Sequence, residues 1–119
     1  MDPIFHKKIV VNHFGGPEVL TVEDAQTPPP EIGFARLKVL AVGLGYTDIV
    51  ARRGEYVLAH HLPFTPGYEL VGEVLDDNPG PGGERPAWLR PGVRVAVCLP
   101  KMAAYTECIS LPYSLLVPL

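Results

Sequence analysis

Residue types that could do chemistry are concentrated in two short stretches, residues 43–48 (GLGYTD) and residues 62–69 (LPFTPGYE). The second stretch ends in Tyr68 and Glu69, a phenol beside a carboxylate, directly before an apolar run. A carboxylate is costly to bury alone, so Glu69 is expected to have a cationic or backbone donor partner. We therefore interpret Glu69 as a structural link at a corner rather than as a general base.

Proline and glycine restrict the backbone that leads to this pair. The two proline steps, residues 62–63 and 65–66, favour an extended or turning chain. Gly67 can then take a backbone conformation that is closed to other residues. Gly67 is expected to form the same corner as Glu69.

Other arrangements that would support chemistry are missing from the sequence. Residues 43–48 lack the third glycine of a dinucleotide-binding GxGxxG loop. No serine has a nucleophile-elbow context, and neither Cys98 nor Cys108 has a histidine close by in sequence. The adjacent His60 and His61 would point to opposite sides of an extended segment, so we expect solvated histidines and no metal site. Both cysteines are expected to be small core residues.

Length and composition indicate one folded domain over residues 1–119. The chain has 119 residues, of which 47% are hydrophobic, and a formal net charge of -3. The basic residues are scattered, which argues against nucleic acid as a partner. No apolar run is long enough for a membrane span, and the first residues lack a signal-peptide core, so a cytoplasmic protein is expected.

Hydrophobic alternation predicts a mainly β fold with many turns. The clearest strand is residues 34–42 (FARLKVLAV), where Arg36 and Lys38 should point away from the apolar side. Further strands are expected at residues 7–11, 19–24, 69–75, 93–99, 104–110 and 115–119. Seven short strands favour a barrel or sandwich over a βαβ unit. Residues 76–92 should form a long surface connection, attached by Trp88 and Leu89.

One segment, residues 47–54 (TDIVARRG), has the end signals of a short helix. Thr47 is a possible N-cap, and Asp48 would lie near the positive end of the helix dipole. Gly54 provides a C-terminal stop.

Four motifs in order resemble a known family. They are GLGYTDIVARRGEY, LPFTPGYELVGEV, LRPGVRVAV and MAAYTECISLPYSLLVPL. This order is similar to the N-terminal half of the medium-chain dehydrogenase/reductases, the superfamily of zinc alcohol dehydrogenases and zinc-free quinone oxidoreductases. The resemblance covers nearly the whole chain.

The resemblance implies a GroES-like, partly open β-barrel with one or two short helices, which forms one wall of an active-site cleft. In that family a following Rossmann domain, absent from this chain, binds NADPH or NADH and supplies most of the homodimer contacts. Residues 1–119 would then be a fragment of a longer two-domain reductase and inactive alone. A stand-alone barrel that acts as a non-catalytic binding module is the alternative, and an enoyl reductase module of a multi-enzyme is a third possibility.

The resemblance also bears on zinc. Zinc-dependent members have a cysteine where this chain has Gly45 and a histidine where it has Tyr68, and neither present residue can replace that ligand. The cysteine-rich structural zinc lobe is reduced to a short link with Cys98. Without a Lewis acid, the implied substrates are quinones or α,β-unsaturated carbonyls, which accept hydride with help from hydrogen bonds alone. Quinone oxidoreductases usually have asparagine at the place of Gly45, so the resemblance does not extend to the polar contact that asparagine makes.

The same resemblance implies roles for individual residues of the cleft. Tyr46 and Thr47 would face the nicotinamide and substrate and donate hydrogen bonds to the oxygen that gains charge. Tyr56 and Tyr68 would line the same cleft. Helix capping by Thr47 and simple packing of Tyr46 and Tyr56 are the alternatives. Arg52 is expected to be structural, bonded to loop carbonyls or to Glu69.

Overall fold

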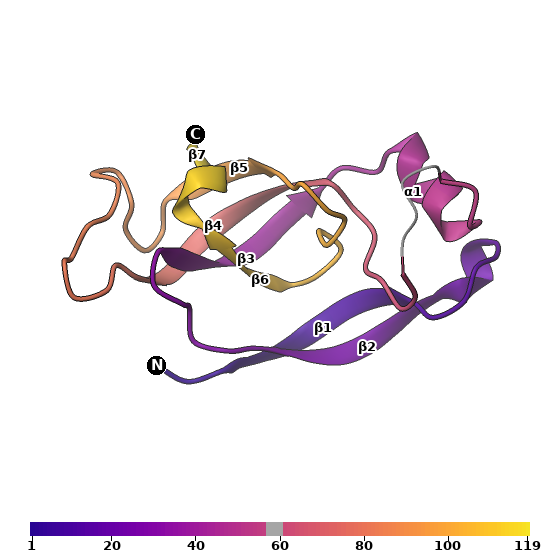
Figure 1. Ribbon diagram of the computed structural model, residues 1–119, viewed down its shortest axis with the longest axis horizontal. Helices are drawn as coiled ribbons and strands as arrows, with labels where there is room; N and C mark the ends of the chain where they lie inside the picture. The colour runs from indigo at the N-terminus through magenta and orange to yellow at the C-terminus, as the bar shows by residue number, and fades with distance from the viewer. Residues whose placement is uncertain (57–60) are drawn as a thin grey trace.

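Two antiparallel β-sheets and one α-helix make up the fold in the computed structural model, which describes residues 1–56 and 61–119. A five-stranded sheet has the order β6-β3-β4-β5-β7, and a separate two-stranded ribbon pairs β1 with β2. Figure 1 shows the ribbon lying along one side of the five-stranded sheet, with α1 at one end of both. The elements are β1 (Ile4–Val11), β2 (Leu20–Thr27), β3 (Phe34–Val42), α1 (Tyr46–Arg52), β4 (Glu69–Asn78), β5 (Arg94–Cys98), β6 (Cys108–Pro112) and β7 (Val117–Pro118), with 3-10 turns at Pro17–Val19 and Tyr113–Leu115.

The central strand β3 has the bounds that its alternating pattern predicts. Ala35 and Leu37 are fully buried in the core that β3 shares with β4 and β5. The pairing of β3 with β4 changes register between Arg36 and Leu37 and again between Val39 and Ala41. Such irregularities bend a sheet, and the bend gives the expected mainly β, partly open barrel.

Backbone hydrogen bonds join the β1–β2 ribbon to the rest of the barrel. The Ile9 amide donates to the Tyr105 carbonyl at 2.9 Å, and the Glu107 amide donates to the Lys7 carbonyl at 3.0 Å. Further along β1, Val11 and Phe64 exchange two backbone bonds of 2.8 and 3.1 Å. These bonds attach one edge of β1 to the segments at Phe64 and at residues 105–107, which holds the ribbon against the rest of the barrel.

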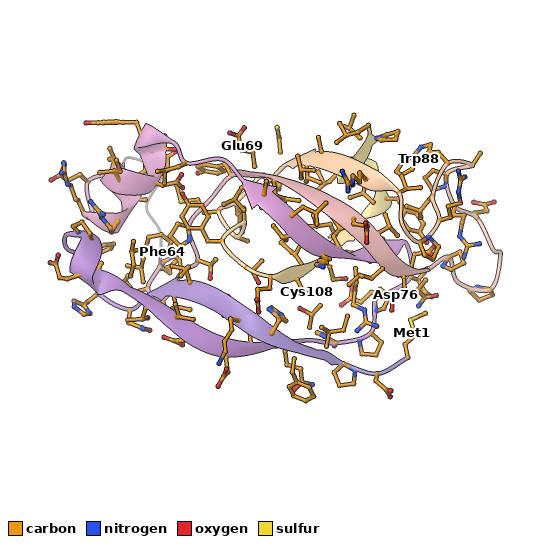
Figure 2. The ribbon with its side chains drawn as sticks, turned by 180° about the vertical axis from the view of Figure 1, so that it is seen from behind. Met1, Phe64, Glu69, Asp76, Trp88 and Cys108 are labelled. Atoms are coloured by element: carbon orange, nitrogen blue, oxygen red, sulfur yellow. The ribbon has the colours of Figure 1, made fainter. Side chains whose placement is uncertain are left out.

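Arg36 differs from the simple alternation that describes its strand. Its side chain is expected to point away from the core, yet the residue is only 2% exposed, because the ribbon covers that face of β3. The guanidinium makes two bonds to Asp76, at 2.8 and 2.5 Å, and donates to the carbonyls of Asp2 and Thr27 at 2.7 and 3.3 Å. Figure 2 labels Asp76 in the region between the sheet and the ribbon. The ion pair joins neighbouring strands of the sheet, and the bonds from Arg36 to the Asp2 and Thr27 carbonyls link the sheet to the ribbon.

Helix α1 begins one residue earlier than predicted, and its cap is a different residue. Gly45 is the N-cap, and no side-chain cap bond is made there, so the expectation that Thr47 caps the helix is wrong. The Asp48 carboxylate instead accepts the Gly45 amide at 2.9 Å. Gly54, with φ of +79°, follows the helix as the predicted stop.

Other expectations are met in part. Leu89 is buried and Trp88 packs against the core, so these residues attach the long 76–92 connection as predicted. Cys108 is buried as expected, but Cys98 is exposed because it ends β5 at the sheet surface. His60 lies outside the described residues, and His61 is exposed.

The last two strands are shorter than predicted. β6 begins at Cys108 rather than at residue 104, and the final apolar run divides into a 3-10 turn and the two-residue β7. Within the described part of the chain, no helix has the length and apolar character needed to cross a membrane.

Replacing Asp76 with alanine should destabilise the protein, because the buried Arg36 charge would lose its partner. We expect a loss of about 3 kcal/mol, at the low end for buried pairs since the Asp76 side chain is 28% exposed. Urea unfolding measures this. The matched control is Asp24→Ala, which breaks the exposed pair with Lys7 and should change stability little. Equal losses in the two variants would contradict the role given to Arg36.

Candidate functional site

The buried carboxylate of Asp48 joins three separate segments at the end of the barrel. It is 5% exposed. Its Oδ2 accepts the Gly45 amide at 2.9 Å and the Tyr105 hydroxyl at 3.3 Å, and its Oδ1 accepts the Gly67 amide at 2.9 Å. The start of α1, the turn before β4 and the segment before β6 therefore meet at one side chain.

Gly67 lies at the corner where the 62–69 stretch enters β4. It has φ of +99°, and a Cβ at this position would lie 2.6 Å from the Tyr105 ring and 2.8 Å from the Ala104 side chain. Its carbonyl accepts the amides of Ala103 and Ala104 at 2.9 and 3.1 Å. Both the backbone conformation and the close packing therefore require glycine here.

Two tyrosines predicted to line the cleft are in direct contact. The Tyr68 hydroxyl donates to the Tyr56 hydroxyl at 3.2 Å, and the rings meet edge to face with centroids 6.5 Å apart. The hydrogen bond with Tyr56, followed by burial, raises the pKa of Tyr68 to about 12. Tyr68 is therefore a neutral phenol at physiological pH.

Tyr46 and Thr47 occupy the first turn of α1 and are exposed; Tyr46 is 67% exposed. Because Gly45 and Gly67 donate to the same carboxylate, the residues that follow them, Tyr46 and Tyr68, start from neighbouring points of the backbone. The fold thus brings the two predicted stretches to one place.

Glu69 and Arg52 do not interact in the way expected of them. Glu69 is exposed, and no hydrogen bond or ion pair to its carboxylate is found within residues 1–56 and 61–119. It packs over Gly43, where a Cβ would lie 2.0 Å from its Oε1. A solvated carboxylate needs no partner, which explains why the expected one is missing. No hydrogen bond or ion pair joins the Arg52 side chain to Glu69 or to a loop carbonyl among the described residues, and its buried Nε has no hydrogen-bond partner there.

The residues at this place do not fit a zinc ion. Gly45 has no side chain to offer, and the Tyr68 phenol is protonated and engaged with Tyr56. Within the described ranges, no three histidine, cysteine or acidic side chains lie close enough to hold a metal. The one carboxylate at the centre, Asp48, is occupied by amide and hydroxyl donors.

The carboxylate that holds the corner is Asp48 rather than Glu69, the acid expected there from the sequence. Asp48 was expected only to favour the helix dipole, and Tyr105 only to be a strand residue, yet these two form the network that orders the site. A signal was available, since an aspartate three residues after an N-cap can bond back to the cap amide. The cross-chain bonds to Gly67 and Tyr105 have no local signal.

Replacing Asp48 with alanine would leave the Gly45 and Gly67 amides without acceptors. We expect a loss of about 3 kcal/mol in the free energy of unfolding. Thr47→Ala, one residue away on the exposed side of α1, should stay within about 0.5 kcal/mol of the parent. Urea unfolding of both variants tests this. A loss of unfolding free energy in Thr47→Ala that exceeds this limit would indicate that Thr47 caps the helix after all.

Tyr105 makes a pH-dependent contribution to stability. Burial, and then the Asp48 charge, raise the pKa of its phenol to about 12 in the folded chain. The unfolded phenol ionises near about pH 10. The contribution is therefore complete below about pH 10 and is lost as the pH rises toward 12. Tyr105→Phe should make this alkaline loss of stability shallower, as measured by unfolding at several pH values; an unchanged slope would refute it.

Comparison with known proteins agrees with the geometry. The family described as alcohol dehydrogenase GroES-like domain matches residues 32–115. A quinone oxidoreductase of Lama guanicoe is 34% identical over 102 residues, which is 85% of this chain and 29% of that protein. An alcohol dehydrogenase of Geobacillus stearothermophilus is 34% identical over 70 residues, 59% of this chain and 20% of that protein.

Solved structures of quinone oxidoreductases have the same fold. The Pseudomonas syringae enzyme superposes with a TM-score of 0.79 at 32% identity, covering 96% of this chain and 33% of that one. The Thermus thermophilus enzyme, solved also in complex with NADPH, gives 0.72 at 33% identity, covering 95% and 31%. The chain thus spans about a third of the length of these relatives. This chain belongs to the alcohol dehydrogenase GroES-like domain family of the medium-chain dehydrogenase/reductase superfamily.

Proposed function

We propose that residues 1–119 form the substrate-side domain of a zinc-independent, NAD(P)H-dependent oxidoreductase that reduces quinones or α,β-unsaturated carbonyls. The observation that carries this proposal is the pair of corners held by Asp48. Gly45 and Tyr68 stand at those corners, and neither is a zinc ligand. The quinone oxidoreductase relatives support the same reaction class.

The nicotinamide cofactor would be bound mainly by a Rossmann domain outside residues 1–119. NADPH supplies a hydride when bound, and solved relatives include NADPH complexes. This chain offers a fitting surface at the start of α1, where Leu44 is 78% exposed and Tyr46 67% exposed beside Thr47. A planar ring can lie against such a mixed apolar and hydroxyl surface.

Hydroxyl groups of this chain would stabilise the charge that develops on the acceptor. When a hydride adds to a conjugated carbon, the carbonyl oxygen gains negative charge. The Tyr46 phenol or the Thr47 hydroxyl would donate a hydrogen bond to that oxygen, and neither has a partner in the described chain that would compete. Tyr56 and Tyr68 would form the neighbouring wall and help to exclude water. Quinones and enones need no Lewis acid for this step.

The remaining proposals concern the whole protein. The relatives are about three times longer than this chain, so we propose that the protein at its native length includes the Rossmann domain and acts as a cytoplasmic homodimer. Residues 1–119 alone would not turn over substrate.

The direct test is NADPH oxidation by the protein at its native length, with menadione and cyclohexenone as acceptors and with metal content measured on the same sample. We expect activity with at least one acceptor, substoichiometric zinc and no loss of activity after chelation. Stoichiometric zinc would refute the zinc-independent part. Absence of both NADPH binding and turnover would favour a non-catalytic binding module.

Tyr46→Phe tests the proposed hydrogen-bond donor. We expect kcat/KM to fall about 10-fold, mostly through kcat, because the lost bond is made chiefly to the developing charge. The control is Tyr113→Phe, since the Tyr113 hydroxyl bonds Asp77 elsewhere in the fold at 2.6 Å. A control variant that loses as much activity, or an unaffected Tyr46→Phe, would contradict the role.

A further inference from the structure

The guanidinium of Arg52 includes a buried N–H donor for which the described residues supply no acceptor. Its Nε is buried and has no hydrogen-bond partner within residues 1–56 and 61–119. A buried N–H without an acceptor costs about 1–3 kcal/mol, so native structures nearly always supply one. Because no acceptor is found among the described residues, a small molecule held beside Arg52 is a candidate for it.

A small cavity of about 40 Å³ lies beside Arg52, between α1 and the ribbon. Arg52 is four residues after Asp48, so both side chains lie on one face of α1. The cavity is lined by Leu20, Leu44, Asp48, Ile49, Arg52, Pro66 and Tyr105.

The size and polarity of the cavity select its occupant. One water molecule needs roughly 10–15 Å³ of such space and two or more polar partners, so the volume admits about three waters, and the polar groups decide which of them is ordered. The Arg52 Nε–H can donate to a water, and the Asp48 carboxylate can accept from it. That carboxylate has roughly four acceptor sites and receives three protein bonds, so one site remains.

The charges around the cavity favour a neutral occupant. A small anion would meet the Asp48 carboxylate in the same cavity, and a cation would meet the Arg52 guanidinium. The other lining side chains, apart from Tyr105, are apolar and favour neither. A neutral molecule that both donates and accepts hydrogen bonds matches both groups.

We propose that an ordered water molecule in this cavity bridges Arg52 Nε to the Asp48 carboxylate. The bridge satisfies the buried N–H and gives Asp48 a fourth hydrogen bond. Arg52 then becomes a positioning residue for the carboxylate that holds Gly45 and Gly67. This inference rests on the geometry alone and stands whether or not the protein is a reductase.

A high-resolution crystal structure of the protein at its native length tests the site directly. We expect a single well-ordered water within hydrogen-bonding distance of both Arg52 Nε and an Asp48 oxygen. A bromide soak should leave the site without an anomalous peak. An empty cavity, a bromide peak, or an Nε bonded to a protein carbonyl would each overturn the proposal.

Arg52→Met provides the second readout, because it keeps a long apolar side chain but removes the donor. We expect the water to disappear and Tm to fall by about 2–4 °C. The matched control is Arg53→Met at the exposed neighbouring position, which should keep both the water and the Tm. Retention of the water in Arg52→Met would show that Arg52 does not hold it; failure of this variant to fold leaves the parent crystal structure as the deciding test.

Discussion

The fold of the candidate site depends on one buried carboxylate. Asp48 accepts hydrogen bonds from two glycine amides and one tyrosine hydroxyl, contributed by three segments that are far apart in the sequence. A buried carboxylate with several donors is stabilising only while all of them are present, because each lost donor leaves a charge less well solvated. The same dependence explains why Gly67 has a backbone conformation that other residues avoid: its amide must point at Asp48 while the chain turns into β4.

A second buried polar contact holds the two layers of the barrel together. Arg36 bonds Asp76 on β4 and two carbonyls in the N-terminal part of the chain, so it crosses from the five-stranded sheet to the ribbon. Apolar packing of β3, β4 and β5 supplies the bulk of the core. The polar contacts tie the ribbon and α1 to that core, and Asp48 brings together the backbone at Gly45 and Gly67, which precede Tyr46 and Tyr68.

Local patterns were sufficient to predict part of this arrangement. Alternation predicted the bounds of β3, and glycine and dipole signals predicted α1 to within two residues at either end. Burial of Arg36 was not predictable, because alternation along one strand does not reveal a second layer on its polar face. The choice between Asp48 and Glu69 was equally hidden, since it depends on which acid meets donors from distant segments.

We propose that the two corners held by Asp48 form a metal-free wall for the nicotinamide and its acceptor. A crystal structure of the native-length protein with NADPH tests this most directly. We expect the nicotinamide ring to lie against Tyr46 and Thr47, with Tyr68 still bonded to Tyr56 and no metal density near residues 45 and 68. A metal ion coordinated at those corners, or a nicotinamide bound away from α1, would contradict it.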